Sequence, residues 1–146
     1  MKPVVTSRSP FRVRKRIRFS HVDAAGIVFY PRYFELYNEV VEDWFAAALE
    51  LPFDQLVDRL SAGVPTVTIA CEFTAPTRLG EDLDFELRVA ELGRSSFALL
   101  VDAHAGTELR LRGRSTLVFA RLSEHGPLRP QPIPAELRGR MESFLA

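Results

Sequence analysis

The residues that decide the fold are 31–48, which read PRYFELYNEVVEDWFAAA. Their apolar side chains recur at steps of three and four residues, with polar and charged side chains between them. Pro31 suits the first turn of a helix, because the N–H that it lacks would have no partner there. The spacing predicts an amphipathic helix of about five turns that buries a wide aromatic stripe. The members of this stripe are Tyr33, Phe34, Tyr37, Val40, Val41, Trp44, Phe45 and Ala48.

Strands are predicted on both sides of this helix. Residues 11–19 alternate between mostly apolar side chains and arginine, which is typical of a half-buried strand with a solvated arginine face. After the helix, Leu51 and Pro52 break the periodicity, and a short second helix is predicted at 53–60. Further strands are predicted at 65–74, 82–92, 95–105 and 108–122, with turns at 93–94 and 106–107, a loop at 123–133 and a closing helix at 134–145.

The order of one strand, one long helix and four strands predicts an α+β fold, in which a single helix lies on an antiparallel sheet. The other face of such a sheet, or one of its edge strands, needs cover from a second subunit. We therefore expect an oligomer.

The composition fits one globular domain over residues 1–146, with a polar flexible tail at 1–10. Nineteen basic residues balance nineteen acidic ones, so bulk charge supports neither a nucleic-acid nor a membrane partner. Cys71 is the sole cysteine, which excludes an internal disulfide and favours a cytoplasmic location. No apolar run reaches the length of a signal peptide or of a membrane span.

Few groups in the sequence can carry chemistry. There is no Gly-x-Ser-x-Gly elbow and no phosphate-binding glycine loop, and no His-x-x-x-His or Cys-x-x-Cys spacing suggests a metal site. What remains is Asp23, in the segment 21–31, HVDAAGIVFYP. The small residues after it let a bulky ligand approach the backbone, and the following helix offers free N–H groups at its positive end.

A carboxylate next to oxyanion donors is sufficient for acyl transfer. On these residues alone, however, a turn or capping role for Asp23 is the more frequent alternative. Cys71 lies in the middle of a predicted strand on an apolar face, and we interpret it as a packing residue.

The run from Asp23 to Phe34, DAAGIVFYPRYF, closely resembles the signature of the 4-hydroxybenzoyl-CoA thioesterase family, Pseudomonas type. Weaker likeness continues at 63–65, at Phe73 and at 94–97. The resemblance implies the hot-dog fold, in which a five-stranded antiparallel sheet wraps a long central helix. It also implies assembly into a homodimer or homotetramer.

The same resemblance implies an acyl-CoA thioesterase that hydrolyses an aromatic acyl-CoA, of the 4-hydroxybenzoyl or benzoyl type, to free acid and coenzyme A. Asp23 would be the nucleophile or general base, and the backbone N–H of Tyr30 would polarise the thioester carbonyl. Coenzyme A is part of the substrate, and no further cofactor is implied. The substrate-binding residues carried over are Gly26, Ile27, Phe29, Tyr33 and Phe34, with Arg94 as a contact to the phosphates of CoA.

The chain departs from the family pattern at three places. Ala24 stands where the family has proline, and Gly93–Arg94–Ser95 replaces a run of three cations, of which Arg94 is kept as the candidate contact to the CoA phosphates. Glu72 and Pro76 differ from the polar or small residues expected on the facing strand, which leaves the acyl group open. A short-chain branch of the family has histidine at the position of Pro31, so Pro31 favours the aromatic branch. The alternatives are a short-chain acyl-CoA or acyl-carrier-protein thioesterase and a non-catalytic acyl-CoA-binding module. Val28 stands where a hot-dog hydratase needs histidine, which argues against a hydratase.

Overall fold

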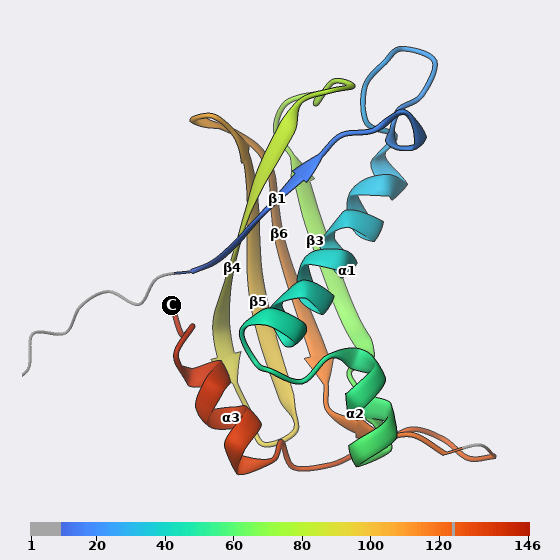
Figure 1. The fold of residues 1–146 in the computed structure, drawn as a ribbon, viewed down its shortest axis with the longest axis vertical. Coiled ribbons are helices and arrows are strands. Elements are labelled where there is room, and N and C mark those ends of the chain that lie inside the picture. Colours follow the sequence, from blue (N-terminus) through green and yellow to red (C-terminus); the bar gives the residue numbers. More distant parts are fainter. Residues whose placement is uncertain (1–9, 124) are drawn as a thin grey trace, which may run out of the picture.

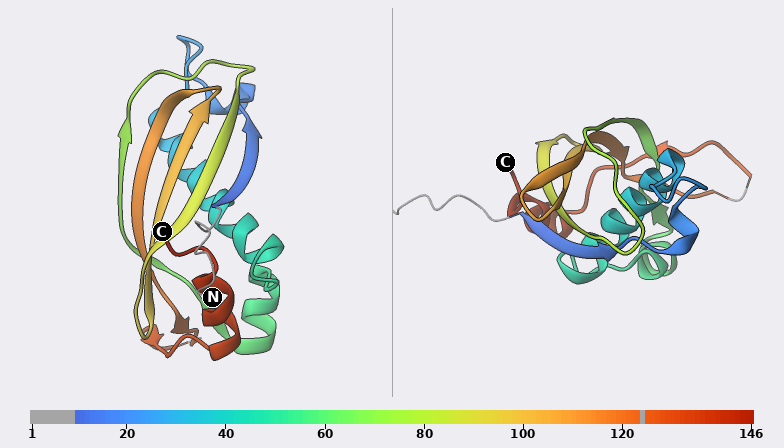
Figure 2. Two further views of the ribbon diagram at one scale, coloured as in Figure 1. Left: turned by 90° about the vertical axis from the view of Figure 1, so that its left-hand side faces the viewer. Right: turned by 90° about the horizontal axis from the view of Figure 1, so that it is seen from above.

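The computed structural model describes residues 10–123 and 125–146. Within them, a five-stranded antiparallel sheet has the order β1-β4-β5-β6-β3. The long helix α1 (Tyr30–Ala47) lies against one face of this sheet, and the strands curl around it (Figures 1 and 2). The predicted α+β arrangement of one helix on an antiparallel sheet is therefore confirmed. The strands are β1 (Phe11–Arg16), β3 (Thr66–Phe73), β4 (Asp82–Leu92), β5 (Ser96–Ala105) and β6 (Glu108–Val118).

Shorter elements complete the described part of the chain. The helices α2 (Phe53–Leu60) and α3 (Ala135–Glu142) lie where the sequence predicts them. A small second sheet was not predicted, because its strands have only two residues and no periodicity: β2 (Ala62–Gly63), β7 (Ala120–Arg121) and β8 (Arg129–Pro130). Residues 1–9 of the predicted tail lie outside the described residues. None of the described helices combines the length and the apolar character that a membrane crossing requires.

The prediction for the end of the first strand was wrong. The alternating pattern places Phe19 on the buried face, but the strand ends at Arg16 and the Phe19 side chain is 83% exposed. Residues Phe19–His21 instead form a short 3-10 turn, η1. Nδ1 of His21 accepts a hydrogen bond from the N–H of Arg18 at 2.8 Å, and this local bond closes the turn at the cost of strand pairing.

The core lies between α1 and the inner face of β4, β5 and β6. Trp44 and Phe45 on the helix are fully buried. The ring of Phe97 on β5 lies 6.4 Å from the ring of Trp44 and 6.2 Å from that of Phe45. Burying side chains of this size stabilises a fold by about 1.5–3 kcal/mol each. The C-terminal half of α1 is thereby anchored in the core, and the N-terminal end of α1 joins the loop that precedes it (Figure 1).

The arginine face of β1 is solvent exposed, as predicted, and it is paired with acidic side chains of β4. Arg14 and Arg16 each make two hydrogen bonds to a carboxylate, that of Asp84 and that of Asp82. These ion pairs follow from the strand register, because each arginine lies directly opposite the aspartate that it binds. The arginines of β1 therefore serve strand pairing.

The edge strand β3 is poorly covered. Among the described strands, it pairs only with β6, and it forms one end of the sheet. Val67, Ile69 and Phe73 are 57%, 40% and 42% exposed. An exposed apolar edge strand of this kind is a surface on which another strand can pair.

Candidate active site

Asp23 begins a tight turn, which two backbone hydrogen bonds close. The N–H of Asp23 donates to the carbonyl of Ile27 at 3.0 Å, and the N–H of Gly26 donates back to the carbonyl of Asp23 at 3.0 Å. Gly26 has a φ of +76°, in the left-handed region that glycine adopts without strain. The loop is therefore built as a tight turn, and the predicted substrate residues Gly26 and Ile27 are part of it.

The carboxylate of Asp23 is held by its own loop. Its Oδ1 accepts a hydrogen bond from the N–H of Ala25 at 2.8 Å, and the side chain stays exposed. This local bond is the turn role that an aspartate in a loop commonly has. It occupies one of the two carboxylate oxygens, so the turn role and a role in chemistry are compatible.

The loop leads directly into α1. The N–H of Phe29 donates to the carbonyl of His21 at 3.0 Å, which joins the two ends of the loop. Tyr30 is the first residue of α1, and Pro31, which follows it, has no N–H. The N–H of Arg32 donates to the carbonyl of Phe29. The N–H of Tyr30 is thus a donor that the helix does not use. It lies at the positive end of the helix dipole, where an oxyanion is stabilised.

A second segment, from Thr77 to Glu81, lies alongside the Asp23 loop. The N–H of Val28 donates to the carbonyl of Thr77 at 2.9 Å, and the N–H of Leu79 donates to the carbonyl of Gly26 at 3.1 Å. Ile27 and Arg78 form an isolated antiparallel bridge between these two bonds. The sequence did not predict this pairing, because neither segment is long enough to show strand periodicity.

A buried polar cluster lies beneath that second segment. The hydroxyl of Tyr33 donates to Oγ1 of Thr77 at 2.9 Å, and both side chains are buried. Arg110 makes two hydrogen bonds to the carboxylate of Glu81, at 3.1 and 2.9 Å, although it is only 9% exposed. The arginine hydrogen bonds hold the pKa of Glu81 below its ordinary value. Buried polar side chains of distant segments were not visible as a pattern in the sequence.

The predicted substrate residues divide into two groups. Phe29 and Tyr30 are 48% and 60% exposed beside the Asp23 loop. Tyr33 is buried, with its hydroxyl bound to Thr77 and its ring stacked on Phe73 at 5.0 Å. Phe34 meets the same Phe73 ring edge-on at 6.1 Å. The structure therefore gathers an aromatic cluster from α1 and β3, and Phe73 belongs to it.

Within one chain, Arg94 lies far from the other predicted site residues. It lies in the turn between β4 and β5, at the lower end of Figure 1, whereas the loop before α1 is at the upper end. The start of β4 is joined to this upper end, because Gly80 donates to the carbonyl of Ile17 at 2.9 Å. The 11 residues of β4 then span roughly 35 Å before Arg94 is reached.

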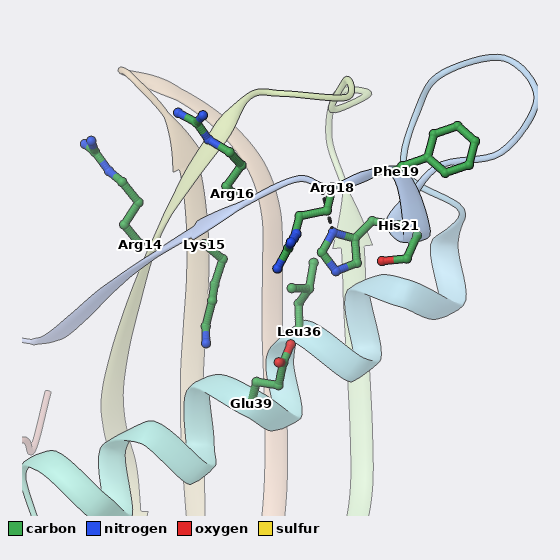
Figure 3. Close-up of a pocket in the computed structure, with 9 residues that line it drawn as sticks. Arg14, Lys15, Arg16, Arg18, Phe19, His21, Leu36 and Glu39 are labelled. Carbon is green, nitrogen blue, oxygen red and sulfur yellow. Dashed lines mark hydrogen bonds between the residues drawn. The ribbon is translucent and has the colours of Figure 1, made fainter.

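A cavity of about 720 Å³ opens between β1, η1 and α1, close to the start of the Asp23 loop (Figure 3). Several basic side chains line it, together with Phe19, His21 and Glu39. Its positive charge is mostly compensated, because Arg14 and Arg16 are bound to carboxylates and Lys15 lies 2.7 Å from Asp43. The cavity is therefore not a strongly cationic site.

Cys71 is half-buried on β3, and burial raises the pKa of its thiol. A raised pKa disfavours the thiolate form that acts as nucleophile or metal ligand. Among the described residues, histidine, cysteine and acidic side chains form no group of three that could hold a metal ion. The Asp23 carboxylate and the end of α1 therefore form the candidate active site.

Known proteins share both the sequence and the architecture. Residues 17–141 match the family model of the Thioesterase-like superfamily. The 1,4-dihydroxy-2-naphthoyl-CoA hydrolase of Synechococcus elongatus is 33% identical over 88 residues, 60% of this chain and 64% of that protein, so the match spans less than two thirds of its length. The 4-hydroxybenzoyl-CoA thioesterase of Pseudomonas sp. strain CBS-3 is 27% identical over 130 residues, 85% of this chain and 92% of that protein.

Solved structures extend the likeness to nearly the whole chain. The structure of the Pseudomonas 4-hydroxybenzoyl-CoA thioesterase superposes with a TM-score of 0.83 at 25% identity, over 90% of this chain and 99% of that one. A gentisyl-coenzyme A thioesterase superposes with a TM-score of 0.78 at 27% identity, over the same shares of the two chains. The hot-dog fold implied by residues 23–34 is thereby confirmed. The chain belongs to the Thioesterase-like superfamily.

Proposed function

We propose that this chain hydrolyses an acyl-CoA thioester to the free acid and coenzyme A, with Asp23 as the catalytic carboxylate. The observation that carries the proposal is the exposed Asp23 side chain, held by Ala25 in a loop that leads directly into α1 at Tyr30. The match to the Thioesterase-like superfamily over residues 17–141 supports it.

The chemistry uses two groups of the chain. The N–H of Tyr30, at the positive end of α1, donates to the thioester oxygen and stabilises the negative charge that develops there. The second oxygen of the Asp23 carboxylate, Oδ2, is left by the loop for the reaction. Either Oδ2 attacks the carbonyl carbon and expels the CoA thiolate, forming an anhydride that water then cleaves, or it takes a proton from the water that attacks. Both routes consume one water and need no cofactor beyond the CoA of the substrate.

We propose an aromatic acyl group for the substrate. The names of three relatives specify acyl groups with an aromatic ring: 1,4-dihydroxy-2-naphthoyl, 4-hydroxybenzoyl and gentisyl. In this chain Phe29, Tyr30 and Phe73 present exposed rings, and Phe34 packs against Phe73. An aromatic pair contributes about 0.5–1.5 kcal/mol beyond its buried area, so such a cluster favours a flat acyl group over a short aliphatic one.

The proposed functional unit is a homodimer or homotetramer. The exposed Val67, Ile69 and Phe73 on the edge strand β3 offer a surface for a second copy. A second copy could also supply the contact to the CoA phosphates proposed for Arg94, because that residue lies far from Asp23 within one chain.

The experiment is a measurement, with a thiol reagent, of the free thiol that hydrolysis releases over a panel of substrates. The panel contains benzoyl-, 4-hydroxybenzoyl-, acetyl- and butyryl-CoA, and an acyl-carrier protein loaded with benzoyl or butyryl groups. We expect turnover of the aromatic thioesters with the highest kcat/KM, unchanged by a chelator. If no thioester of the panel is hydrolysed, the proposal is wrong; if the short-chain thioesters are preferred, the aromatic assignment is wrong.

A further inference from the structure

Arg110 is placed in the interior by an irregularity of its strand. Along the β5–β6 pairing, Leu111 lies opposite Ala103 and Leu109 lies opposite His104, so Arg110 has no opposite residue. An extra residue of this kind is a β-bulge, which turns a side chain away from the alternation of the strand. Arg110 and Leu111 are consequently both buried, although they are neighbours in a strand.

The guanidinium of Arg110 binds three parts of the 76–81 segment. It donates to the carbonyl of Pro76 at 2.9 Å, to Oγ1 of Thr77 at 3.3 Å and to both oxygens of Glu81. Oε1 of Glu81 in turn accepts the N–H of Arg78 at 2.8 Å. Planar, two-bond pairing of arginine with a carboxylate fixes geometry as well as charge, so this segment has one preferred shape.

The 76–81 segment packs against the Asp23 loop. The bonds from Val28 to Thr77 and from Leu79 to Gly26 join the two backbones. Tyr33 of α1 binds the same Thr77 hydroxyl that Arg110 binds, so the helix end is tied to the cluster as well. Movement of the Thr77–Glu81 segment would therefore shift the Asp23 loop relative to α1.

We propose that Arg110, through its ion pair with Glu81, is a positioning residue that fixes the Asp23 carboxylate relative to the N-terminus of α1. Its role in turnover rests on the hydrolysis proposed above, whereas its role in holding the loop does not. A displacement of about 1 Å in a catalytic group lowers the rate by roughly a hundredfold. The contact to the CoA phosphates proposed for Arg94 lies outside this loop, so most of the loss should appear in kcat.

The test compares Arg110→Met with Arg112→Met in the full chain. Arg112 is two residues further along β6 and makes the same two-bond pairing with Asp102, but on the exposed face. We expect Arg110→Met to lower kcat by roughly a hundredfold with KM changed by less than about threefold. Arg112→Met should leave both unchanged, and Arg110→Lys, which keeps the charge, should recover part of kcat.

Hydrogen exchange supplies a readout that does not depend on activity. The amides of Val28 and Leu79 should exchange faster in Arg110→Met than in the wild type, and should be unaffected in Arg112→Met. If Arg110→Met does not fold, Glu81→Gln carries the same comparison, because it removes the charge of the partner in the 76–81 segment and keeps the ion pair between Arg110 and Glu108.

Wild-type kcat and wild-type exchange in a folded Arg110→Met or Glu81→Gln variant would overturn the positioning role. A wild-type protein that releases no CoA refutes the proposed function instead. In that case the exchange rates at Val28 and Leu79 still decide whether Arg110 holds the loop: faster exchange supports this, and unchanged exchange overturns it.

Discussion

The Oδ1 atom of Asp23 accepts a hydrogen bond from the backbone N–H of Ala25 at 2.8 Å. The bond fixes the direction of the carboxylate with groups of the loop alone, and it leaves Oδ2 for other partners. An asparagine at this position can make the same bond through its amide oxygen. The loop conformation and the negative charge can therefore be separated by a single substitution.

Asp23→Asn should keep the fold and lose the activity. The amide retains the acceptor for Ala25 but is neither a nucleophile nor a base, so kcat should fall by at least about a hundredfold. The measurements are CoA release and the melting temperature. Asp54→Asn, the same change at an exposed aspartate in the first turn of α2, is the control and should remain fully active. Retained activity in Asp23→Asn would contradict the mechanism.

The two routes open to Asp23 differ in where oxygen from water goes. In a single turnover in H₂¹⁸O with excess enzyme, cleavage of an anhydride at its aspartyl carbonyl leaves the label in the Asp23 side chain. Mass spectrometry of the peptide that contains Asp23 detects this label. Label found only in the product acid, and never in the peptide, is the result that general-base attack by water gives, and it excludes cleavage of an anhydride at its aspartyl carbonyl.

Periodicity predicted the elements that are long enough to repeat. β4 has the predicted boundaries, and α1 begins and ends within one residue of the positions expected from the spacing of its apolar residues. Phe19 was misplaced because one local bond, from Arg18 to His21, outweighs the alternation. The Asp23 loop was found through a signature in consecutive residues. Arg110, Thr77 and Glu81 were missed, because their relation to the loop exists only after β6 and the 76–81 segment have met.

Phe73→Ala should change substrate preference more than overall activity. The Phe73 ring stacks on Tyr33 at 5.0 Å and is 42% exposed, so its loss removes the β3 side of the aromatic cluster. We expect kcat/KM for benzoyl-CoA to fall by about tenfold, the equivalent of roughly one aromatic contact, with a smaller change for butyryl-CoA. The ratio of the two kcat/KM values is the measurement. An equal loss for both substrates would contradict a role in acyl selection.

Gly113→Ala should destabilise the protein. A Cβ at this position would lie 2.7 Å from a ring carbon of Tyr37 and 3.0 Å from the sulfur of Cys71. Tyr37 cannot easily move aside, because its hydroxyl is bound to Ser115 at 2.7 Å in the core. Overpacking of this kind costs about 1–3 kcal/mol in the free energy of unfolding.

Gly139→Ala is the matched control for that measurement. Gly139 is inside α3, and nothing lies within 4 Å of the Cβ that alanine would add. Alanine favours a helix interior over glycine by about 0.5–1 kcal/mol, so this variant should be as stable as the wild type or more stable. A Gly113→Ala variant as stable as Gly139→Ala would show that the core around Tyr37 adapts.

The contribution of Glu81 to stability should depend on pH in one direction. Hydrogen bonds from Arg110 and from the N–H of Arg78 hold the pKa of the folded Glu81 below its ordinary value of 4.5. A carboxyl with a lowered pKa stabilises the fold above the pKa of the unfolded chain, and this contribution is lost as the pH falls through the folded value. The difference in unfolding free energy between wild type and Glu81→Gln should therefore be largest near neutral pH and shrink below pH 4.5. Denaturant titrations at a series of pH values measure this difference.

The variant pair isolates Glu81 from Asp82 and Asp84, whose pKa values are lowered by Arg16 and Arg14 and which titrate alike in both proteins. A difference that stays constant from pH 7 to pH 3 would mean that the Arg110–Glu81 pair does not stabilise the charged form of Glu81 in the folded chain.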